Sequence, residues 1–283
     1  MTVDIICPLY NAEKNIETLH KSLLKQNKVK INKIIYILTE SKDNTEKILI
    51  RSGIPYSKIK KEDFSHSLTR EEAALESKAD ILVFITQDIK IKREDWLFNL
   101  TKDIENGTVN ASYSRQLCDN ETIEKYTREC NYPAQSKIVS KEDINKLGLK
   151  TFFFSDASSA IKRETFVKLN GYDHKNLPIS EDMYIAYKLI MNGYKIKYCA
   201  DSEVVHSHKF TLKQYYDRYK NTGKFFKEND YLNKYKVNQA GGDMAVYIFK
   251  RALQDRNWNA LANFIPNMAA RFIGMKMEKF NGK

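Results

Sequence analysis

Two acidic segments about a hundred residues apart have the side chains needed for chemistry at a divalent cation. Ile179-Ser180-Glu181-Asp182 places two adjacent carboxylates at an expected helix start, and Thr86-Gln87-Asp88 places one carboxylate directly after an apolar run. An acid at a strand end can hold a divalent cation, and a second acid across a cleft can take the proton of a hydroxyl group. Transfer of a nucleotide-activated sugar requires both groups.

The elements that must position these acids alternate along the first ninety or so residues. Apolar runs at Val3–Cys7, Ile34–Leu38 and Ile81–Ile85 predict three strands. Between them, helical spacing follows Asn11 as an N-cap, the Ser41–Thr45 turn leads into a second helix, and Thr69–Lys78 forms a third. Strands that alternate with helices of this length predict βαβ units and a parallel sheet, so the fold class is α/β.

Ligands of open parallel sheets bind beyond the carboxyl ends of the strands. The segments that follow the three strands are Pro8-Leu9-Tyr10-Asn11, Thr39-Glu40-Ser41 and Thr86-Gln87-Asp88. We therefore expect these segments to converge on one pocket.

Composition is ordinary for a globular protein, with 42% hydrophobic and 29% charged residues among 283. The chain has neither a basic leader before its first strand nor an apolar run of about 18 residues, so we expect no signal peptide and no transmembrane helix. Cys7, Cys118, Cys130 and Cys199 form no CxxC pair, which favours reduced thiols and a cytoplasmic location over a zinc site or a disulfide framework.

Positive charge is concentrated in the tail: residues 211–283 hold 14 Lys and Arg against 6 Asp and Glu, which gives +8 of the total of +11. Ala245, Ile248, Phe249, Ala252 and Leu253 form one helical stripe. A second stripe contains Leu261, Phe264, Ile265, Met268 and Phe272, and Pro266 interrupts it. These stripes can pack on the catalytic domain or on a second subunit, or the basic helices can lie on an anionic membrane.

Eight short motifs resemble, in their order, the family 2 glycosyltransferases of GT-A fold, and they cover roughly residues 3–226. Within that family they are most similar to the bacterial rhamnosyltransferases of surface-polysaccharide (capsule or O-antigen) assembly. The motifs are Pro8-Leu9-Tyr10-Asn11, Phe64-Ser65-His66-Ser67-Leu68-Thr69-Arg70, Phe84-Ile85-Thr86-Gln87-Asp88, Ser114-Arg115-Gln116, Tyr132-Pro133, Gly171-Tyr172, Glu181-Asp182 and Val205-His206-Ser207-His208.

The resemblance implies an inverting transfer from a nucleoside-diphosphate sugar, assisted by Mg²⁺ or Mn²⁺. Asp88 matches the last acid of the family's DxD motif and would bind the metal, with His206 or His208 near the metal or the diphosphate. Asp182, or else Glu181, would be the catalytic base. The nucleotide-sugar site would comprise Pro8, Tyr10, Asn11, Thr39, Glu40, Arg70, Gln87 and Arg218, and Ser155 and Asp156 would lie beside the acceptor.

Two departures from the family pattern bear on this assignment. The second strand often ends in an acid that binds the base, whereas Leu38 and Thr39 stand here and Glu40 follows. The DxD motif keeps only its last acid, so fewer carboxylates hold the metal. His206 and His208 alternate on one face of an extended segment, but neither a cysteine cluster nor an HExxH motif accompanies them, which argues against a dedicated zinc site.

The sequence thus predicts a GT-A catalytic domain at residues 1–210 and a basic helical extension at residues 211–283. The expected reaction transfers L-rhamnose from its thymidine diphosphate to a glycan or a lipid-linked acceptor. A uridine-diphosphate hexose or N-acetylhexosamine is the alternative donor. A nucleotidyltransferase would need a glycine-rich loop after the first strand, and a nucleic-acid binder would need neither Asp88 nor Asp182.

Overall fold

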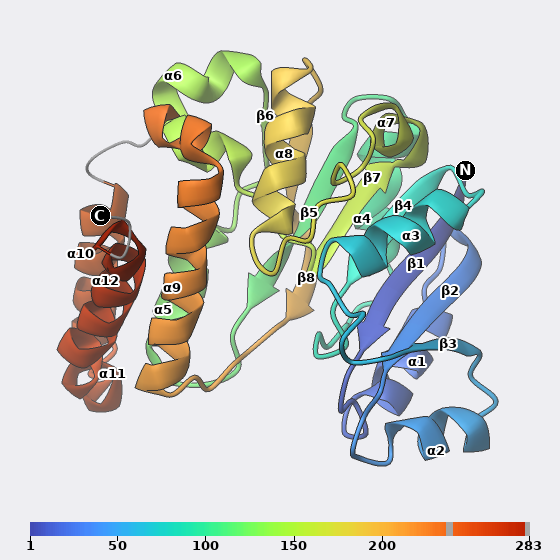
Figure 1. Ribbon diagram of the computed structural model, residues 1–283, viewed down its shortest axis with the longest axis horizontal. Helices are drawn as coiled ribbons and strands as arrows, with labels where there is room; N and C mark the ends of the chain where they lie inside the picture. The colour runs from blue at the N-terminus through green and yellow to red at the C-terminus, as the bar shows by residue number, and fades with distance from the viewer. Residues whose placement is uncertain (236–239, 281–283) are drawn as a thin grey trace. The chain divides into compact units, whose positions relative to one another are not determined.

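The computed structural model describes residues 1–235 and 240–280 and contains two compact units (Figure 1). The first unit comprises Met1–Gln116, Ala134–Glu142 and Thr151–His206, and the second comprises Leu117–Pro133, Asp143–Lys150 and Ser207–Lys283. The second unit therefore combines the C-terminal region with two short segments from the middle of the chain.

The first unit is built on an eight-stranded sheet with the order β3-β2-β1-β4-β7-β5-β8-β6. Its strands are β1 (Thr2–Leu9), β2 (Lys30–Thr39), β3 (Tyr56–Ile59), β4 (Ile81–Ile85), β5 (Ala111–Leu117), β6 (Lys137–Val139), β7 (Ser158–Lys162) and β8 (Ile196–Val205). Strand β1 pairs in parallel with β2 and β4, and β2 pairs in parallel with β3. Strand β7 runs antiparallel to β4 and β5. The predicted α/β sheet with its three N-terminal strands is confirmed.

The core of this unit explains why β4 reads as an uninterrupted apolar run. All five residues of β4 are buried, as expected for a central strand that is covered on both faces. Alternate residues of β1, from Val3 to Leu9, share one apolar cluster with Leu19 and Trp96. These partners belong to helices α1 (Ile16–Leu24) and α4 (Trp96–Glu105).

The other helices of the first unit are α2 (Thr45–Arg51), α3 (Leu68–Glu76), α7 (Arg163–Lys168) and α8 (Glu181–Met191). Helix α3 confirms the helix expected near residues 69–78. The N-cap expected at Asn11 is wrong, because α1 begins at Ile16 with Asn15 as its cap residue. Asn11 instead has a left-handed backbone with φ of 50° and forms hydrogen bonds with Ser41 and Lys42 of the loop after β2.

The second unit is helical, which confirms the helical C-terminal region. It contains α5 (Ile123–Asn131), α6 (Ile144–Leu147), α9 (Leu212–Glu228), α10 (Ala240–Gln254), α11 (Trp258–Ala262) and α12 (Phe264–Phe280). Short 3-10 turns lie at Lys141–Asp143, Gly148–Phe152 and Asp230–Tyr235. Within residues 1–235 and 240–280, no helix has both the length and the apolar character that crossing a membrane requires.

Pro266 does not interrupt the second apolar stripe in the way the sequence suggested. The stripe is divided earlier, at Asn263, between α11 and α12. Pro266 then lies in the first turn of α12, where the amide N–H that proline lacks would have no intrahelical partner. The proline therefore marks the start of a helix rather than a break within one.

Helices α9 and α12 approach each other closely because each carries a glycine at the contact. A Cβ atom on Gly274 would lie 2.5 Å from the carbonyl oxygen of Tyr216, and one on Gly223 would lie 2.8 Å from that of Met275. Both obstacles are backbone atoms, which cannot rotate away. The two helices must therefore separate if either glycine gains a side chain.

We expect Gly274→Ala to lower the free energy of unfolding by about 1–3 kcal/mol, the usual cost of overpacking. Gly242→Ala is the matched control, since Gly242 is also helical and its added Cβ would meet nothing within 4 Å. Alanine there should be neutral or stabilising by up to about 1 kcal/mol. Urea unfolding followed by circular dichroism measures both. Equal stability of the two variants would contradict this account of the contact.

Candidate active site

The loops after β1 and β4 are joined at the carboxyl edge of the sheet by one side chain. The Tyr10 backbone N–H donates to Gln87 Oε1 at 2.6 Å, and Gln87 Nε2 donates to the Tyr10 carbonyl oxygen at 2.6 Å. Gln87 therefore pairs with the backbone of Tyr10 as a neighbouring strand would. This pairing places the segment that carries Asp88 beside the segment that carries Tyr10 and Asn11.

The loop after β2 joins the same group. The Asn11 backbone N–H donates to Ser41 Oγ at 2.9 Å, and Lys42 N–H donates to Asn11 Oδ1 at 3.1 Å. Ser41 Oγ in turn donates to the Thr39 carbonyl oxygen at 2.9 Å. The three segments expected to converge therefore do meet at one edge of the sheet.

The residues predicted for the nucleotide differ in accessibility. Tyr10 is 39% exposed, and Lys61 Nζ lies 5.6 Å from its ring centroid. Glu40 is exposed as well, and its backbone N–H donates to the Ile59 carbonyl oxygen. Thr39 is buried, and its Oγ1 has no hydrogen-bond partner within the described residues. Pro8 is half-buried inside β1, opposite Ile37 of β2.

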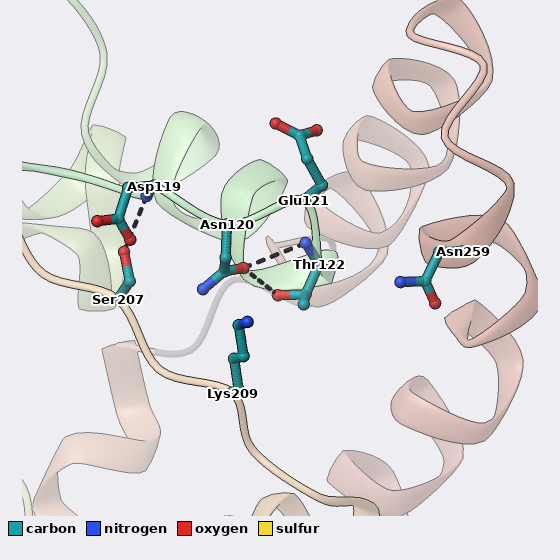
Figure 2. Close-up of a pocket in the computed structure, with 7 residues that line it drawn as sticks. All are labelled: Asp119, Asn120, Glu121, Thr122, Ser207, Lys209 and Asn259. Carbon is teal, nitrogen blue, oxygen red and sulfur yellow. Dashed lines mark hydrogen bonds between the residues drawn. The ribbon is translucent and has the colours of Figure 1, made fainter.

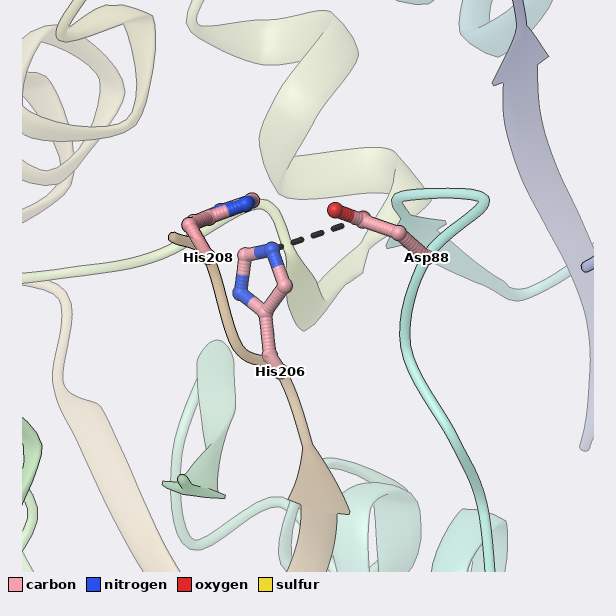
Figure 3. A group of neighbouring side chains, drawn as sticks. All are labelled: Asp88, His206 and His208. Atoms are coloured by element: carbon pink, nitrogen blue, oxygen red, sulfur yellow. Dashed lines mark ion pairs between the residues drawn. The ribbon is translucent and has the colours of Figure 1, made fainter. Parts of the chain in front are cut away.

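Asp88 lies beyond the end of β4 and does not cap a helix, because the next helix, α4, begins only at Trp96. Its Oδ1 lies 3.4 Å from Nε2 of His206, which is 7% exposed and follows the end of β8 (Figure 3). A backbone bridge holds the two segments together, since Lys90 N–H donates to the Val205 carbonyl at 2.8 Å and Val205 N–H to the Lys90 carbonyl at 3.0 Å. Asp88 and His206 are thus positioned by main-chain hydrogen bonds.

The contact made by Nδ1 of His206 shows how the imidazole is oriented toward Asp88. His206 Nδ1 lies 2.9 Å from Gln116 Oε1, and Gln116 Nε2 donates to Ser155 Oγ at 2.8 Å. Since Oε1 can only accept, it accepts from Nδ1, and Nε2 is the ring nitrogen that faces the Asp88 carboxylate. An imidazole nitrogen and a carboxylate oxygen at this separation can both contact one cation. The donor set therefore fits a divalent cation that accepts both oxygen and nitrogen ligands.

His208 follows two residues later, in the second unit. Its backbone N–H donates to Glu124 Oε2 at 2.7 Å, its carbonyl oxygen accepts from Asn120 Nδ2 at 3.1 Å, and its ring stacks on Phe210 at 4.7 Å. Arg218 is also in the second unit, on α9, with its guanidinium 5.9 Å from the Phe210 ring. The roles predicted for His208 and Arg218 stay predictions.

Glu181 and Asp182 begin α8, and they differ in burial. Glu181 is 8% exposed, and its Oε1 lies 3.6 Å from Arg70 Nη1. Asp182 is half-buried, and its Oδ1 accepts from the Met183 backbone N–H at 2.7 Å. Ser180, the residue before them, has a left-handed φ of 62°. Of the two adjacent acids, Glu181 is therefore directed into the protein and Asp182 is the one that solvent reaches.

Arg70, predicted near the donor, is buried, with its Nη1 also donating to the His66 carbonyl oxygen at 2.8 Å. His66 Nδ1 lies 3.9 Å from Glu181 Oε1. Although burial acts to lower it, the carboxylates of Glu181 and Asp156 hold the pKa of Arg70 above its ordinary value. Arg70 is therefore the cation that offsets the charge of buried acids.

Asp156 lies in the same buried group. It is 2% exposed, and its two oxygens accept from Ser159 Oγ and the Tyr172 hydroxyl, both at 2.7 Å. Burial raises the pKa of this carboxyl, while Arg70 acts to lower it. Ser155 is half-buried and bonded to Gln116. The acceptor contacts predicted for Ser155 and Asp156 stay predictions.

The structure explains why a glycine precedes the tyrosine in the Gly171-Tyr172 motif. The Tyr172 backbone N–H donates to Glu71 Oε1 at 2.6 Å, and a Cβ atom on Gly171 would lie 2.6 Å from that oxygen. Gly171 also has a positive φ of 44°, which favours glycine. The glycine lets the backbone approach Glu71, and the loop then places the Tyr172 hydroxyl on Asp156.

The thiol of Cys7, in the middle of β1, is close enough to Arg70 and Asp88 for both charges to affect its pKa. Burial raises the pKa of Cys7, Arg70 acts to lower it, and Asp88 acts to raise it. Asp88 and Arg70 therefore both lie near the middle of β1, and Arg70 in turn faces Glu181.

Two features were missed at the sequence level. Gln116 belongs to the Ser114-Arg115-Gln116 motif, but the sequence predicts no role for it, because its contacts with His206 and Ser155 join residues far apart in the chain. The second is a pocket of about 560 Å³ in the second unit (Figure 2). It is lined by Asp119, Asn120, Glu121, Thr122, Ser207, Lys209 and Asn259. The polar run 119–122 was the available signal, but nothing in the sequence joins it to Asn259.

Comparison with known proteins agrees with this geometry. The model of the family described as glycosyl transferase family 2 matches residues 4–169. The O-antigen chain rhamnosyltransferase RfbN of Salmonella typhimurium is 32% identical to this chain over 286 residues, covering 99% of this chain and 90% of its own. The related WbaN of Salmonella anatum is 31% identical over 283 residues, covering 97% and 88%. The chain belongs to the family 2 glycosyltransferases, and it is a glycosyltransferase enzyme.

Solved structures show the same fold. The mannosyltransferase PcManGT of Pyrobaculum calidifontis, in complex with GDP-Man and Mn²⁺, matches with a TM-score of 0.58 at 18% identity, covering 99% of this chain and 76% of its own. Residues 1–349 of S. aureus TarS match with a TM-score of 0.54 at 15% identity, covering 99% and 92%. The GT-A-like architecture is therefore confirmed.

We expect Gln116→Leu to weaken Mn²⁺ binding by about 10–100-fold, because a bonded partner fixes the orientation and proton of a metal-ligating imidazole. Gln116→Glu is the matched control, since a carboxylate still accepts the Nδ1 proton. Calorimetric titration with Mn²⁺ measures both variants against the parent protein. If Gln116→Leu binds Mn²⁺ as the parent does, then Gln116 does not orient His206.

Proposed function

We propose that this protein transfers L-rhamnose from dTDP-L-rhamnose, with inversion, to an O-antigen-type glycan or its lipid-linked precursor. The observation that carries the proposal is the Asp88–His206 pair beyond the ends of β4 and β8, with Nε2 of the imidazole facing the carboxylate at 3.4 Å. The identity to an O-antigen chain rhamnosyltransferase over nearly the whole chain supports rhamnose as the sugar.

Asp88 and His206 would hold Mg²⁺ or Mn²⁺. The Cα atoms of residues two apart can be separated by at most about 7 Å, so His208 is tethered close enough to His206 to contribute a further ligand. When bound, the cation neutralises charge on the departing nucleoside diphosphate. The fold neighbour that was solved with Mn²⁺ and GDP-Man supports a cation together with a nucleotide sugar.

Asp182 is the proposed base, because it is the acid of the pair that solvent, and therefore an acceptor hydroxyl, can reach. A carboxylate within hydrogen-bond distance can take that proton as the hydroxyl attacks the anomeric carbon. Glu181, which faces Arg70, would instead hold the start of α8 in place. Arg70 would then act on the site through Glu181.

The exposed groups at the carboxyl edge, Tyr10, Asn11 and Glu40, would contact the nucleotide together with Pro8 and Thr39. Gln87 would support them by holding the Tyr10 backbone. The buried Thr39 Oγ1, which has no partner within the described residues, is suited to a hydrogen bond with the ligand. Arg218 would face the leaving diphosphate.

The acceptor would be oriented near Ser155 and Asp156, and the polar pocket of the second unit would take a further part of the glycan. Amide, hydroxyl and carboxylate side chains line that pocket, and these groups bond well to sugar hydroxyls. Residues 1–210 would form the catalytic domain and residues 211–283 the helical extension. We place the enzyme in the cytoplasm, at the inner face of the cell membrane where its acceptor is lipid-linked.

Substitution of the two acids separates their roles. We expect Asp182→Asn to lower kcat by about 10²–10⁴-fold, the usual contribution of a general base, while the melting temperature stays unchanged. Glu181→Gln should lower the free energy of unfolding by about 1–3 kcal/mol, because Arg70 loses a charged partner. Rhamnosyl transfer and thermal unfolding are measured on both. Full activity of Asp182→Asn would remove Asp182 as the base.

A donor panel tests the sugar and the nucleotide. A ligand that binds only the native protein stabilises it by about 2.7 kcal/mol at a concentration of 100 Kd. With Mn²⁺ present, dTDP-L-rhamnose should raise the melting temperature more than UDP-glucose, UDP-N-acetylglucosamine or GDP-mannose. If a uridine-diphosphate sugar gives the largest rise, the rhamnose assignment is wrong and the alternative donor replaces it.

A further inference from the structure

The C-terminal helices of the second unit expose large apolar side chains. On α12, Ile265 is 76% exposed, Phe272 is 65% exposed and Ile273 is 50% exposed. On α10, Val246, Phe249 and Leu253 are 53%, 46% and 52% exposed. Trp258, at the start of α11, is 69% exposed. Single exposed apolar residues are ordinary, but a contiguous set marks an interaction surface.

The spacing shows that these side chains form faces rather than scattered positions. Val246, Phe249 and Leu253 recur at intervals of three and four residues along α10, which places them on one side of the helix. Ile265, Phe272 and Ile273 share one side of α12 in the same way. The Phe249 ring lies 5.5 Å from the ring of Phe264, the neighbour of Ile265, so α10 and α12 are adjacent at this point. We call these seven exposed residues the apolar face.

Other sides of the same helices are occupied within the unit. Ile248 and Ala252 of α10 are buried in a cluster with Ile123 and Tyr126 of α5, and Phe264 and Met268 of α12 pack against that cluster. The apolar face is therefore not the core side of an incompletely packed helix. Its side chains stay exposed although the core of the second unit has packed.

Cations accompany the apolar face. Lys250 and Arg256 are exposed beside and beyond its α10 part, and Lys276 is exposed on the α12 part with its Nζ 5.6 Å from the Phe272 ring. Asp243 lies at the start of α10, and Asp255, which follows α10, is paired with Lys125 and Arg251 at 3.3 and 3.4 Å. The charge beside the apolar side chains is therefore positive.

We propose that the apolar face of α10, α11 and α12 docks on an anionic lipid surface. Apolar side chains between lysine and arginine are the composition of helices that lie in the interface of a bilayer, with the cations at the headgroups. A second copy of this chain fits less well, because a symmetric contact would place the cations of both copies in one interface. The proposal adds to the proposed function the surface that would bring the enzyme to a lipid-linked acceptor.

Vesicle co-sedimentation tests the docking without measuring glycosyl transfer. The full chain should bind vesicles that contain phosphatidylglycerol and should bind pure phosphatidylcholine at least about tenfold more weakly. Binding should fall as NaCl rises from about 0.05 to 0.5 M, because the charge attraction is screened. Absence of binding to anionic vesicles at low salt overturns the proposal.

Two double variants locate the surface. Ile265→Asp with Phe272→Asp should weaken vesicle binding at least about tenfold, because both side chains would otherwise enter the interface. Leu24→Asp with Ile50→Asp is the matched control, since these first-unit residues are 65% and 66% exposed; it should bind as the parent does. Circular dichroism and melting temperature verify that both variants fold. Equal loss in both variants would overturn the assignment to α10–α12.

Sedimentation velocity tests whether a second copy of the chain, rather than lipid, covers the apolar face. If the parent protein is a dimer, Ile265→Asp with Phe272→Asp makes it a monomer, and neither binds vesicles, then the apolar face is a subunit contact and the proposal is wrong. Rhamnosyl transfer to a water-soluble acceptor is measured separately on the same variants and should be unchanged. Failure of the docking proposal is therefore distinct from failure of the proposed transferase reaction.

Discussion

The candidate site depends on the approach of the Asp88 carboxylate to Nε2 of His206 at 3.4 Å. Two different constraints maintain it. The backbone bridge between Lys90 and Val205 fixes where the two segments lie, and the contact of Nδ1 with Gln116 turns Nε2 of the imidazole toward Asp88. A carboxylate oxygen and an imidazole nitrogen are thereby placed where both can contact one cation. The fold thus positions a donor set that suits a divalent cation.

The buried group around Arg70 differs from the Asp88–His206 pair in its charge balance. Arg70 is surrounded by acids, so its charge is already offset within the protein, and Glu181 is committed to it. Asp182, adjacent in the chain, is only half-buried, because successive helical residues point in different directions. A single helix start therefore supplies one acid that faces Arg70 and one that solvent reaches.

The sequence predicted what depends on local pattern and missed what depends on contact. Apolar runs predicted β1, β2 and β4, most plainly β4, where burial on both faces leaves an uninterrupted hydrophobic segment, and strand ends then predicted that the segments carrying Tyr10 and Asp88 would meet. The contact of Gln116 with His206 could not be predicted, since it joins residues about ninety positions apart and involves no periodicity. The expected cap at Asn11 was wrong for a related reason: its side chain is used by the β2 loop, a tertiary contact that overrides local preference.

The boundary between the two compact units falls after His206, and this has a consequence for any site that uses both histidines. His206 is held by Gln116 in the first unit, whereas the backbone of His208 is held by Glu124 and Asn120 in the second. Only Ser207 separates them, and it accepts from the Asp119 backbone N–H at 2.9 Å. Residues from β5 and from the segment at the start of α5 thus fix the chain on each side of this one connection, so the backbone is held both before and after Ser207.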